Sequence, residues 1–435
     1  MHRMAAADAA SYWMSRRIPN DQFLVYCFAA PSSSVEDCAA RLRLRAALVD
    51  DLCLRIRDVP GTVDRPYWES VSPADDQVRV DSTRRTWSSC LAEIAGLIAR
   101  PLDPTRAAWR AHLFGPVVDA PGAAGDVYVV VVQMCHALGD GRRASQIVRE
   151  WFTAPATPRR PASTRSSGRE LLVDAGTFLG GVLRFPGEFV TTARRGFRVA
   201  RLAPASAPGP SGYPPTRLNT PPRPRRTLRV LVFDRAHLTR RGQPVTVAVL
   251  AAISAALPEY LGETGRRLGV ELTIGRTGEP QARNHFRNAA VDLHVDVDDL
   301  VERARLIGAD VAAARAAEAD PVRLAQHRAS ESTPAILARW GIGAVDLETP
   351  PETVTGVTVV SSVDRGAADI DLDGGEILFT TGFPALSPAQ GLTHGVHGIG
   401  DRIALSVTTS PEVMGDVDRY VELLGRALGV SRSAS

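Results

Sequence analysis

The residues with the clearest capacity for chemistry lie in the segment VYVVVVQMCHALGDGRRA, residues 127–144. Its run of β-branched residues predicts a strand buried on both faces, and this strand ends where Cys135 and His136 meet a Gly-rich turn at residues 139–141. A histidine held there by rigid backbone can point into a cleft, and its ordinary pKa of about 6.5 suits proton removal at neutral pH. His136 is therefore our candidate general base, with a purely structural histidine as the alternative.

Two neighbours of His136 have candidate supporting roles. Asp140 lies four residues on, where its carboxylate can accept hydrogen bonds from turn amides or pair with an arginine and so fix the loop. Cys135 allows a second mechanism, in which the thiol is a nucleophile and forms a covalent intermediate, but we favour a buried structural thiol.

The sequence predicts no metal site. The chain has five cysteines, an odd number without Cys-x-x-Cys spacing, which indicates neither a zinc site nor a disulfide framework. His394 and His397 lie three residues apart in a Gly-rich segment with no nearby carboxylate ligand, so they do not suggest a metal site either.

The elements that must position His136 alternate between strand and helix patterns. Before residue 154 the patterns predict strands and helices in the order strand 23–29, helix 34–49, strand 53–59, helix 88–100, strand 109–114, strand 127–133 and helix 142–152. After residue 227 they predict strand 228–233, helix 245–260, strand 289–295, helix 301–317, strand 355–363, strand 402–408 and helix 417–428. The fold class is therefore α/β with mixed sheets.

Two stretches rich in Pro, Ser, Gly and Arg separate these parts. Residues 154–167 and 203–226 are predicted to be surface linkers, because their composition cannot bury a core. Between them, residues 170–202 show helical spacing interrupted by Pro186, which predicts an outer helix that bridges the halves or lies on a membrane surface. The expected organisation is an N-terminal domain (1–202), a crossover linker (203–227) and a C-terminal domain (228–435).

Composition narrows the class of protein. The 435 residues are 44% hydrophobic and 23% charged, as in packed globular proteins. All 51 basic residues other than histidine are Arg, yet the net charge is only +3, which fits an anionic cofactor or lipid surface and does not indicate nucleic-acid binding. Since no signal peptide or spanning apolar run is present, we expect a cytoplasmic protein, with any membrane contact peripheral.

These motifs resemble those of a known family. CHALGDG is similar to the His-His-x-x-x-Asp-Gly signature of the coenzyme-A-dependent acyltransferase superfamily, and its surroundings resemble bacterial wax ester synthase/diacylglycerol acyltransferases. The matching segments follow the family order: Asp21-Gln22-Phe23, PLDPTRAAW at 101–109, Arg283-Asn284 followed by VDLHVDVDDLVERARLIG, and GLTHGVHGIGDRIALSVTT.

The resemblance implies two chloramphenicol-acetyltransferase-like domains with a tunnel between them. It implies that acyl-CoA is the co-substrate, with no permanently bound cofactor, and that His136 takes the proton of a hydroxyl acceptor before the alkoxide attacks the thioester. Asp140 is then structural and points away from the substrate toward an arginine, while Gly141 allows the tight turn and a close approach of the backbone to the reacting carbonyl. Trp109, Asn284 and Ser362 are the residues that we expect in the substrate tunnel.

Three departures mark a divergent member of that family. The first histidine of the signature is Cys135 here, an Asn-Asp pair in the second half is Thr246-Val247, and an Asn-Val-Pro-Gly-Pro turn appears as residues 362–366. The last change affects the expected tunnel floor and so the choice of acceptor.

The expected function is transfer of a long-chain acyl group from acyl-CoA to diacylglycerol, giving triacylglycerol, or to a fatty alcohol, giving a wax ester. Its expected partners are acyl-CoA, a lipid alcohol and a membrane or lipid-droplet surface that the protein contacts peripherally, with no nucleic acid. The alternatives are a condensation or esterification enzyme of cell-envelope or natural-product lipids that uses an acyl-carrier donor, and a catalytically inactive lipid-binding relative.

Overall fold

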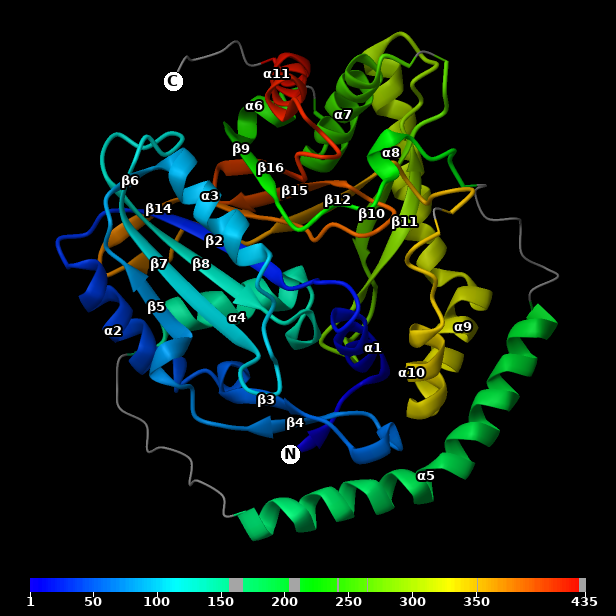
Figure 1. Ribbon diagram of the computed structural model, residues 1–435. Coiled ribbons are helices and arrows are strands. Elements are labelled where there is room, and N and C mark those ends of the chain that lie inside the picture. The colour runs from blue at the N-terminus through cyan, green and yellow to red at the C-terminus, as the bar shows by residue number, and fades with distance from the viewer. Residues whose placement is uncertain (156–166, 203–211, 241, 264, 350, 430–435) are drawn as a thin grey trace.

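Two large β-sheets and one small sheet form the frame of the protein (Figure 1). The computed structural model describes residues 1–155, 167–202, 212–240, 242–263, 265–349 and 351–429. The strands are β1 (His2–Arg3), β2 (Gln22–Ala29), β3 (Leu54–Arg57), β4 (Tyr67–Ser70), β5 (Val78–Asp81), β6 (Arg85–Thr86), β7 (Trp109–Val118), β8 (Val127–Met134), β9 (Thr227–Asp234), β10 (Gly269–Gly275), β11 (Phe286–Asp292), β12 (Thr358–Asp364), β13 (Asp371–Leu372), β14 (Gly375–Gly382), β15 (Leu392–Ile399) and β16 (Arg402–Thr409).

Helices cover the sheets. They are α1 (Ala6–Ser15), α2 (Val35–Ala46), α3 (Trp87–Ile98), α4 (Gly141–Thr153), α5 (Ser167–Leu202), α6 (Arg235–Thr239), α7 (Val245–Leu261), α8 (Leu300–Ala316), α9 (Pro321–Ser332), α10 (Ala335–Gly343) and α11 (Val417–Leu428). Residues of α1, α2 and α4 share one core with the first large sheet, and residues of α7, α8 and α11 share another with the second. The predicted mixed α/β class is confirmed.

The first large sheet has the order β13-β14-β2-β8-β7-β5, with β6 paired to β7. Its centre is β8, whose valines pair with β2 on one side and β7 on the other. Both faces of β8 are buried, as its continuous β-branched run predicts. This burial holds the end of the strand, and hence the start of the His136 loop, in a fixed place.

The second large sheet has the order β11-β10-β12-β15-β16-β9. Strand β12 runs parallel to both of its neighbours, β10 and β15, while the remaining pairs are antiparallel. Because β10 and β12 are parallel, their ends at Gly275 and Asp364 lie along the same edge of this sheet. That edge faces the His136 loop.

Strands β13 and β14 come late in the sequence but join the first sheet. Thr380 and Thr381 of β14 pair antiparallel with Tyr26 and Val25 of β2. A third core cluster continues this connection, since it contains Val25 and Phe379 from the first sheet together with Ala404 from the second. The first sheet is thus built from both halves of the sequence, which its strand patterns do not predict.

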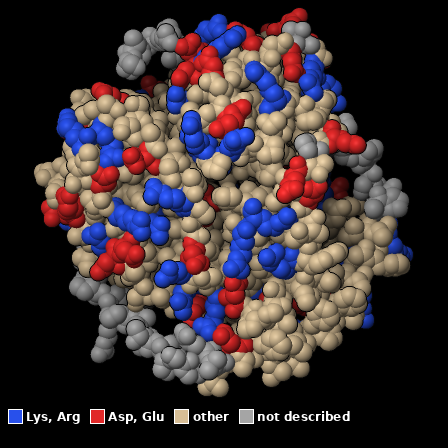
Figure 2. All heavy atoms as spheres, viewed as in Figure 1, with Lys and Arg blue, Asp and Glu red and all other residues tan. Residues whose placement is uncertain are grey.

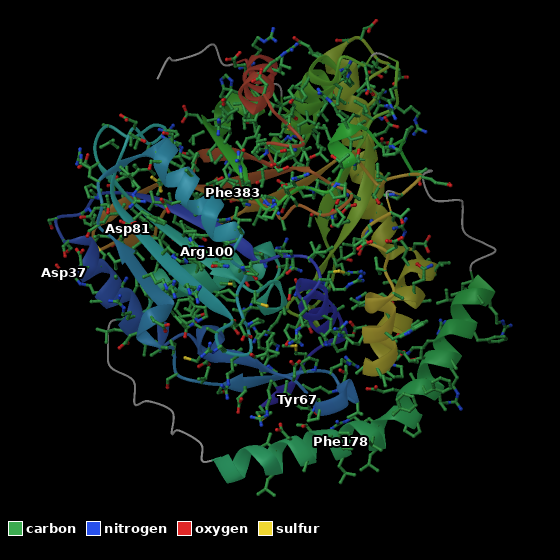
Figure 3. All side chains as sticks on the ribbon, in the orientation of Figure 1. Asp37, Tyr67, Asp81, Arg100, Phe178 and Phe383 are labelled. Atoms are coloured by element: carbon green, nitrogen blue, oxygen red, sulfur yellow. The ribbon has the colours of Figure 1, made fainter. Side chains whose placement is uncertain are left out.

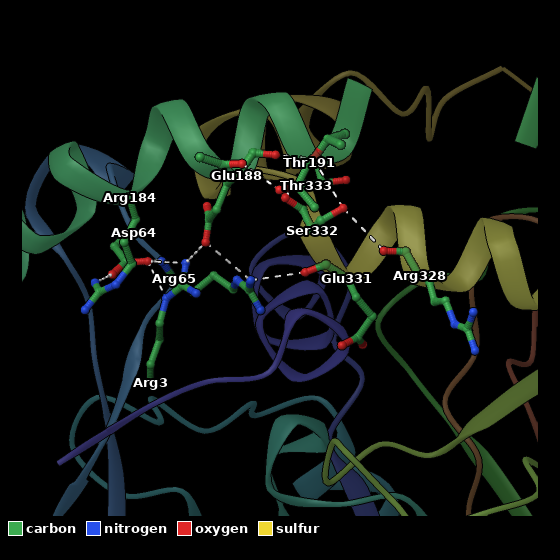
Figure 4. A network of polar contacts seen from close by, with 12 residues as sticks. Arg3, Asp64, Arg65, Arg184, Glu188, Thr191, Arg328, Glu331, Ser332 and Thr333 are labelled. Atoms are coloured by element: carbon green, nitrogen blue, oxygen red, sulfur yellow. Dashed lines mark hydrogen bonds and ion pairs between the residues drawn. The ribbon is translucent and has the colours of Figure 1, made fainter. Parts of the chain in front are cut away.

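Helix α5 lies along the outside of the molecule, beside the small sheet β1-β4-β3 and α9 (Figure 1). Its polar contacts are drawn in Figure 4: Arg184 pairs with the buried Asp64 at 2.7 Å, and Glu188 pairs with Arg3 at 2.6 Å. The expected interruption at Pro186 is wrong, because α5 continues through this residue. Polar contacts on both sides of Pro186 keep the helix docked. No helix in the described part of the chain is long and apolar enough to cross a membrane.

The predicted linkers fall partly outside the described residues, namely at 156–166 and 203–211. Where the second linker is described, the expectation of a surface segment holds for residues 220–225, which are mostly exposed, but is wrong for residues 213–219, several of which are buried. Tyr213 forms a β-bridge with Val354, and Leu218 is fully buried in the core of the second sheet. A Pro-rich composition does not prevent single large side chains from packing.

Most predicted elements appear within a few residues of their expected bounds, but one strand is shifted and several elements are missing from the prediction. The strand expected at 289–295 is β11, which begins and ends three residues earlier. The sequence patterns do not predict eight strands and four helices, namely β1, β4, β5, β6, β10, β13, β14 and β15, and α1, α6, α9 and α10. Tertiary packing decides these elements, because the local periodicity of their sequences is weak.

Candidate functional site

His136 follows β8 directly. The strand ends at Met134, and a single 3₁₀ turn at His136–Leu138 carries the chain to α4. The ring of His136 is partly exposed to a cavity, and its centroid lies 5.6 Å from that of Phe286, the first residue of β11. A rigid strand and a short helical turn thus place the imidazole between the two sheets.

Asn284 fixes the orientation of this imidazole. Its Oδ1 lies 2.9 Å from Nδ1 of His136, and its Nδ2 donates to the backbone carbonyl of His136 at 2.8 Å. Because the amide nitrogen already faces acceptors, Oδ1 must accept, and Nδ1 must carry the proton. The lone pair is then on Nε2, which has no hydrogen-bond partner among the described residues. This is the tautomer that a general base acting through Nε2 needs.

Asp8 of α1 holds Asn284 from behind. Its carboxylate accepts hydrogen bonds from the backbone N–H of Asn284 at 2.8 Å, from Nδ2 of Asn284 at 3.0 Å and from the backbone N–H of Arg283 at 3.1 Å. Asp8 is only 2% exposed, and burial raises the pKa of its carboxyl above the ordinary value, although the three donors oppose the shift. Sequence reasoning missed Asp8, since it lies 276 residues from Asn284 and belongs to no recognisable motif.

The surroundings of His136 favour its neutral form. Burial lowers the pKa of the imidazole, while the hydrogen bond to Asn284 and the negative charges of Asp140 and Asp8 partly oppose this. A neutral imidazole at physiological pH is able to accept a proton.

Asp140 connects the His136 loop to the second half of the chain. It caps α4 by accepting from the backbone N–H of Arg143 at 2.9 Å, and its other oxygen accepts from the backbone N–H of His285 at 3.0 Å. The expectation that Asp140 turns toward an arginine side chain needs correction, because its hydrogen-bond partners are backbone N–H groups. Of the two alternatives for Asp140, the hydrogen bonds to loop amides are the ones observed.

Gly141 allows a close approach between the halves. A Cβ at this position would lie 2.8 Å from Cγ2 of Val363, near the end of β12. The close approach that is observed is to a side chain of the second sheet, and the expected approach of the Gly141 backbone to a reacting carbonyl stays a prediction. The backbone of Gly141 does not have a positive φ, so the turn itself does not require glycine.

A cavity of about 1230 Å³ opens beside His136 at the junction of the sheets. Asn288, Phe286, Ser362 and Phe383 line it, and Phe383 lies near the middle of the view in Figure 3. Its walls also include five cationic or imidazole side chains from α4 and from the β10–β11 connection: Arg142, Arg143, Arg276, Arg283 and His285. The cavity thus combines an available imidazole, apolar surface and a mixture of arginine and carboxylate side chains. Basic and acidic side chains are likewise interspersed on the face of the molecule drawn in Figure 2.

The other candidate residues occupy different places. Ser362 lines the cavity, and its Oγ lies 2.9 Å from Oγ1 of Thr246, one of the residues at the departures from the family pattern. Trp109 as a tunnel residue is wrong: it is fully buried, donates through Nε1 to the carbonyl of Leu52 at 2.8 Å and packs on Trp151. An indole at the start of a central strand packs in the core and leaves no surface for a substrate.

Cys135 is fully buried in the first core, and burial raises the pKa of its thiol to about 12. The protonated thiol is a poor nucleophile, and it does not line the cavity. The structure therefore gives no support to an acyl-enzyme on Cys135.

His394 and His397 lie in different surroundings. His394 is buried between Thr358 and Tyr420, and its two ring nitrogens lie 3.0 and 2.9 Å from their hydroxyls. His397 lines the cavity. Among the described residues, no group of three or more His, Cys, Asp or Glu side chains is arranged to hold a metal ion.

Comparisons with known proteins relate the chain to acyltransferases. Residues 4–243 match the model of the wax ester synthase/diacylglycerol acyltransferase catalytic domain. No curated protein matches the sequence. Among solved structures, the wax ester synthase/diacylglycerol acyltransferase from Marinobacter aquaeolei VT8 has 15% identity and a TM-score of 0.64, over 98% of both chains.

Condensation domains share the fold. The starter condensation domain of rhizomide synthetase, in complex with C8-CoA and Leu-SNAC, has 15% identity and a TM-score of 0.56, over 98% of this chain and 94% of that chain. The first condensation domain of the CDA synthetase has 16% identity and a TM-score of 0.55, over 99% and 97%. At such identities the structural likeness concerns the fold alone. The family match covers more than half of the sequence, and the chain therefore belongs to the wax ester synthase/diacylglycerol acyltransferase family, as a divergent member.

Proposed function

We propose that the protein transfers an acyl group from acyl-CoA to the hydroxyl of a lipid acceptor, with His136 as the general base. The observation that carries this proposal is the hydrogen bond between Nδ1 of His136 and Asn284, which leaves the lone pair of Nε2 available beside the cavity. Family membership supports the acyl-transfer class. Diacylglycerol and long-chain alcohols are the acceptors that the family's name suggests.

The reaction needs one proton to move twice. Nε2 of His136 takes the proton of the acceptor hydroxyl while the hydroxyl oxygen forms a bond to the carbonyl carbon of the thioester. The tetrahedral intermediate then breaks its carbon–sulfur bond, and the imidazolium returns the proton to the thiolate, so that the products are an ester and free CoA. Asn284 and Asp8 stabilise the imidazolium and keep the ring oriented.

Acyl-CoA is the proposed donor on grounds of charge. Arg142 lies on the cavity wall at the start of α4 and has no carboxylate partner among the described residues, so its charge is available to a phosphate of CoA. A condensation domain with this fold binds C8-CoA in its solved structure, which supports the same class of co-substrate here.

The experiment that tests this function follows free CoA thiol released from palmitoyl-CoA, with diacylglycerol or hexadecanol as the acceptor. In His136→Gln we expect turnover to fall by about 10²- to 10⁴-fold, the usual contribution of a general base. Thermal unfolding of the variant checks that it is folded. Full turnover in a folded His136→Gln would rule out His136 as the base.

A second candidate function differs only in the donor. The likeness to condensation domains favours a test in which the acyl group is offered on a carrier protein, beside the same acyl group on CoA. Faster ester formation from the acyl-carrier protein would show that the carrier, and not CoA, delivers the acyl group. The proposed role of His136 would be unchanged. Binding of both donors without ester formation would favour the inactive lipid-binding relative.

We also propose that α5 rests on an anionic lipid surface. Five of its exposed apolar residues recur at intervals of seven or four residues, and so form one stripe along the helix: Leu172, Leu179, Leu183, Val190 and Phe197. Exposed arginines lie near its C-terminal end, at Arg194, Arg198 and Arg201. An apolar stripe with neighbouring positive charge is typical of helices that lie at a membrane interface.

Sedimentation with vesicles tests this surface. The wild-type protein should bind phosphatidylglycerol-containing vesicles more than pure phosphatidylcholine vesicles, and Leu183→Glu should weaken binding several-fold. Leu44→Glu, an exposed leucine on α2, is the matched control and should bind as the wild type does. Equal binding by Leu183→Glu and wild type would contradict a role for α5.

A further inference from the structure

Arg365 is a buried arginine on the cavity wall with no carboxylate partner among the described residues. It follows β12 and is only 6% exposed. Its guanidinium donates to Oγ1 of Thr380 and lies over the ring of Tyr26, 5.1 Å from the centroid, while its Nε has no hydrogen-bond partner. A buried positive charge without a counter-ion is costly unless something pairs with it.

His397 lies beside this guanidinium. It is 5% exposed, lines the same cavity, and its Nδ1 also has no partner. Burial, together with the charge of Arg365, lowers the pKa of His397 far below its ordinary value, so the imidazole stays neutral. The pair therefore carries one positive charge.

The backbone makes room for both side chains. A Cβ at Gly382, the last residue of β14, would lie 2.9 Å from Nη2 of Arg365 and 3.1 Å from Cε1 of His397. A Cβ at Gly395 of β15 would lie 2.5 Å from the same carbon of His397. Glycines in β14 and β15, which belong to different sheets, thus leave room for the side chains of Arg365 and His397.

The turn that carries Arg365 is held in place by α4. Arg149 donates to the backbone carbonyls of Arg365 at 2.8 Å and Ala367 at 2.6 Å, and it pairs with Asp369. This is the turn that departs from the family pattern in the sequence. The contacts of Arg149 therefore fix the backbone of this turn. The hydrogen bond to Thr380 and the contact with Tyr26 fix the guanidinium itself.

We infer that Arg365 and His397 form a subsite for a carboxylate carried by one of the two substrates. The inference rests on the proposed acyl transfer and narrows its substrates, because a diacylglycerol or a simple alcohol would leave the charge of the guanidinium without a counter-ion. One guanidinium beside a neutral imidazole matches the single charge of a carboxylate, and charge-assisted hydrogen bonds to guanidinium N–H groups are strong in buried surroundings. The carboxylate belongs either to a hydroxy-acid acceptor or to the far end of the acyl chain.

Binding measurements by isothermal titration calorimetry test the subsite without turnover. The acceptor arm compares 10-hydroxydecanoate with its methyl ester, and the donor arm compares decanedioyl-CoA with decanoyl-CoA. In one of the arms, wild-type protein should bind the acid at least tenfold more tightly than its neutral counterpart. That arm identifies which substrate carries the carboxylate.

Variants then assign the preference to Arg365. In Arg365→Gln the acid and the neutral compound should bind equally, while Arg365→Lys should keep part of the preference. Arg402→Gln removes an exposed arginine paired with Asp234 and should behave as the wild type. If Arg365→Gln does not fold, the wild-type comparison and Arg365→Lys still decide the matter.

The possible outcomes separate the two proposals. Equal binding of acid and neutral compounds by the wild type in both arms would overturn the subsite and make Arg365 a hydrated structural cation, even if CoA release proceeds. A preference for the acid that depends on Arg365, without CoA release from any donor, would support the subsite and refute the proposed acyl transfer.

Discussion

Asp8 and Asn284 meet in the buried space behind His136, where one carboxylate oxygen accepts from both the backbone and the side-chain nitrogen of the asparagine, at 2.8 and 3.0 Å. The two residues come from α1 and from the connection between β10 and β11. Their contact fixes the amide that selects the tautomer of His136. The proposed base thus depends on a chain of three residues from distant parts of the sequence.

Replacing Asn284 by alanine should lower kcat by roughly tenfold to a hundredfold, the usual effect of losing a hydrogen bond that orients a histidine. The KM for acyl-CoA should change much less, because the amide faces His136 and Asp8. Steady-state kinetics of CoA release measure both parameters. An unchanged kcat would show that the ring keeps its orientation without Asn284.

The rate should fall on the acid side of neutrality with a midpoint below the ordinary histidine value of 6.5, because burial lowers the pKa of His136. The base works in its neutral form, so activity is present above this pKa and is lost as the pH falls through it. Asp8 raises the pKa of His136, and Asp8→Asn should therefore move the midpoint to lower pH. A kcat/KM profile from pH 4.5 to 8 tests this; a midpoint above 6.5, or a shift to higher pH in Asp8→Asn, would contradict it.

Gly141→Ala should destabilise the protein by about 1–3 kcal/mol, the usual effect of forcing an extra methyl group into a packed contact. The added Cβ would lie 2.8 Å from Val363 and would push α4 away from β12. Gly125→Ala is the control, since nothing lies within 4 Å of the position of its Cβ. Denaturant unfolding compares the two variants, and equal stability would show that Val363 moves aside freely.

Asp140→Ala should lose both stability and activity. The loss of the α4 cap should lower the free energy of unfolding by about 1 kcal/mol, and the loss of the contact with the His285 N–H should loosen the His136 loop. Asp320 caps α9, away from the cavity, by accepting from Val322 and Arg323. Asp320→Ala should show a similar loss of stability with normal kcat, and a parallel loss of kcat in both variants would indicate a global effect.

Cys135→Ala should keep most of the activity, because the thiol is buried and its pKa is raised to about 12. Mass spectrometry of the intact wild-type protein during turnover should find no acyl group on the chain. An acyl adduct at Cys135, or loss of turnover in a folded Cys135→Ala, would instead support the nucleophilic mechanism.

Local patterns in the sequence predict the elements that carry the base. The β-branched run of β8 and the Gly-rich turn after it place His136 at the end of a buried strand, and the family motif indicates Asn284. Asp8 was missed because only the folded chain brings α1 to Asn284. Trp109 was misplaced because an aromatic residue beside a motif has the same sequence pattern whether it packs in the core or lines a cavity.

The pairing of β14 with β2 has a consequence for how the protein folds. Residues 375–382 complete a sheet whose other main strands lie before residue 135 in the sequence. Most of the chain must therefore be synthesised before β14 can cover the edge of β2. Until then β2 presents an open edge, the kind of surface at which unfinished chains pair with one another. The pairing of β14 with β2 thus completes the native sheet and at the same time covers the edge at which aggregation could begin.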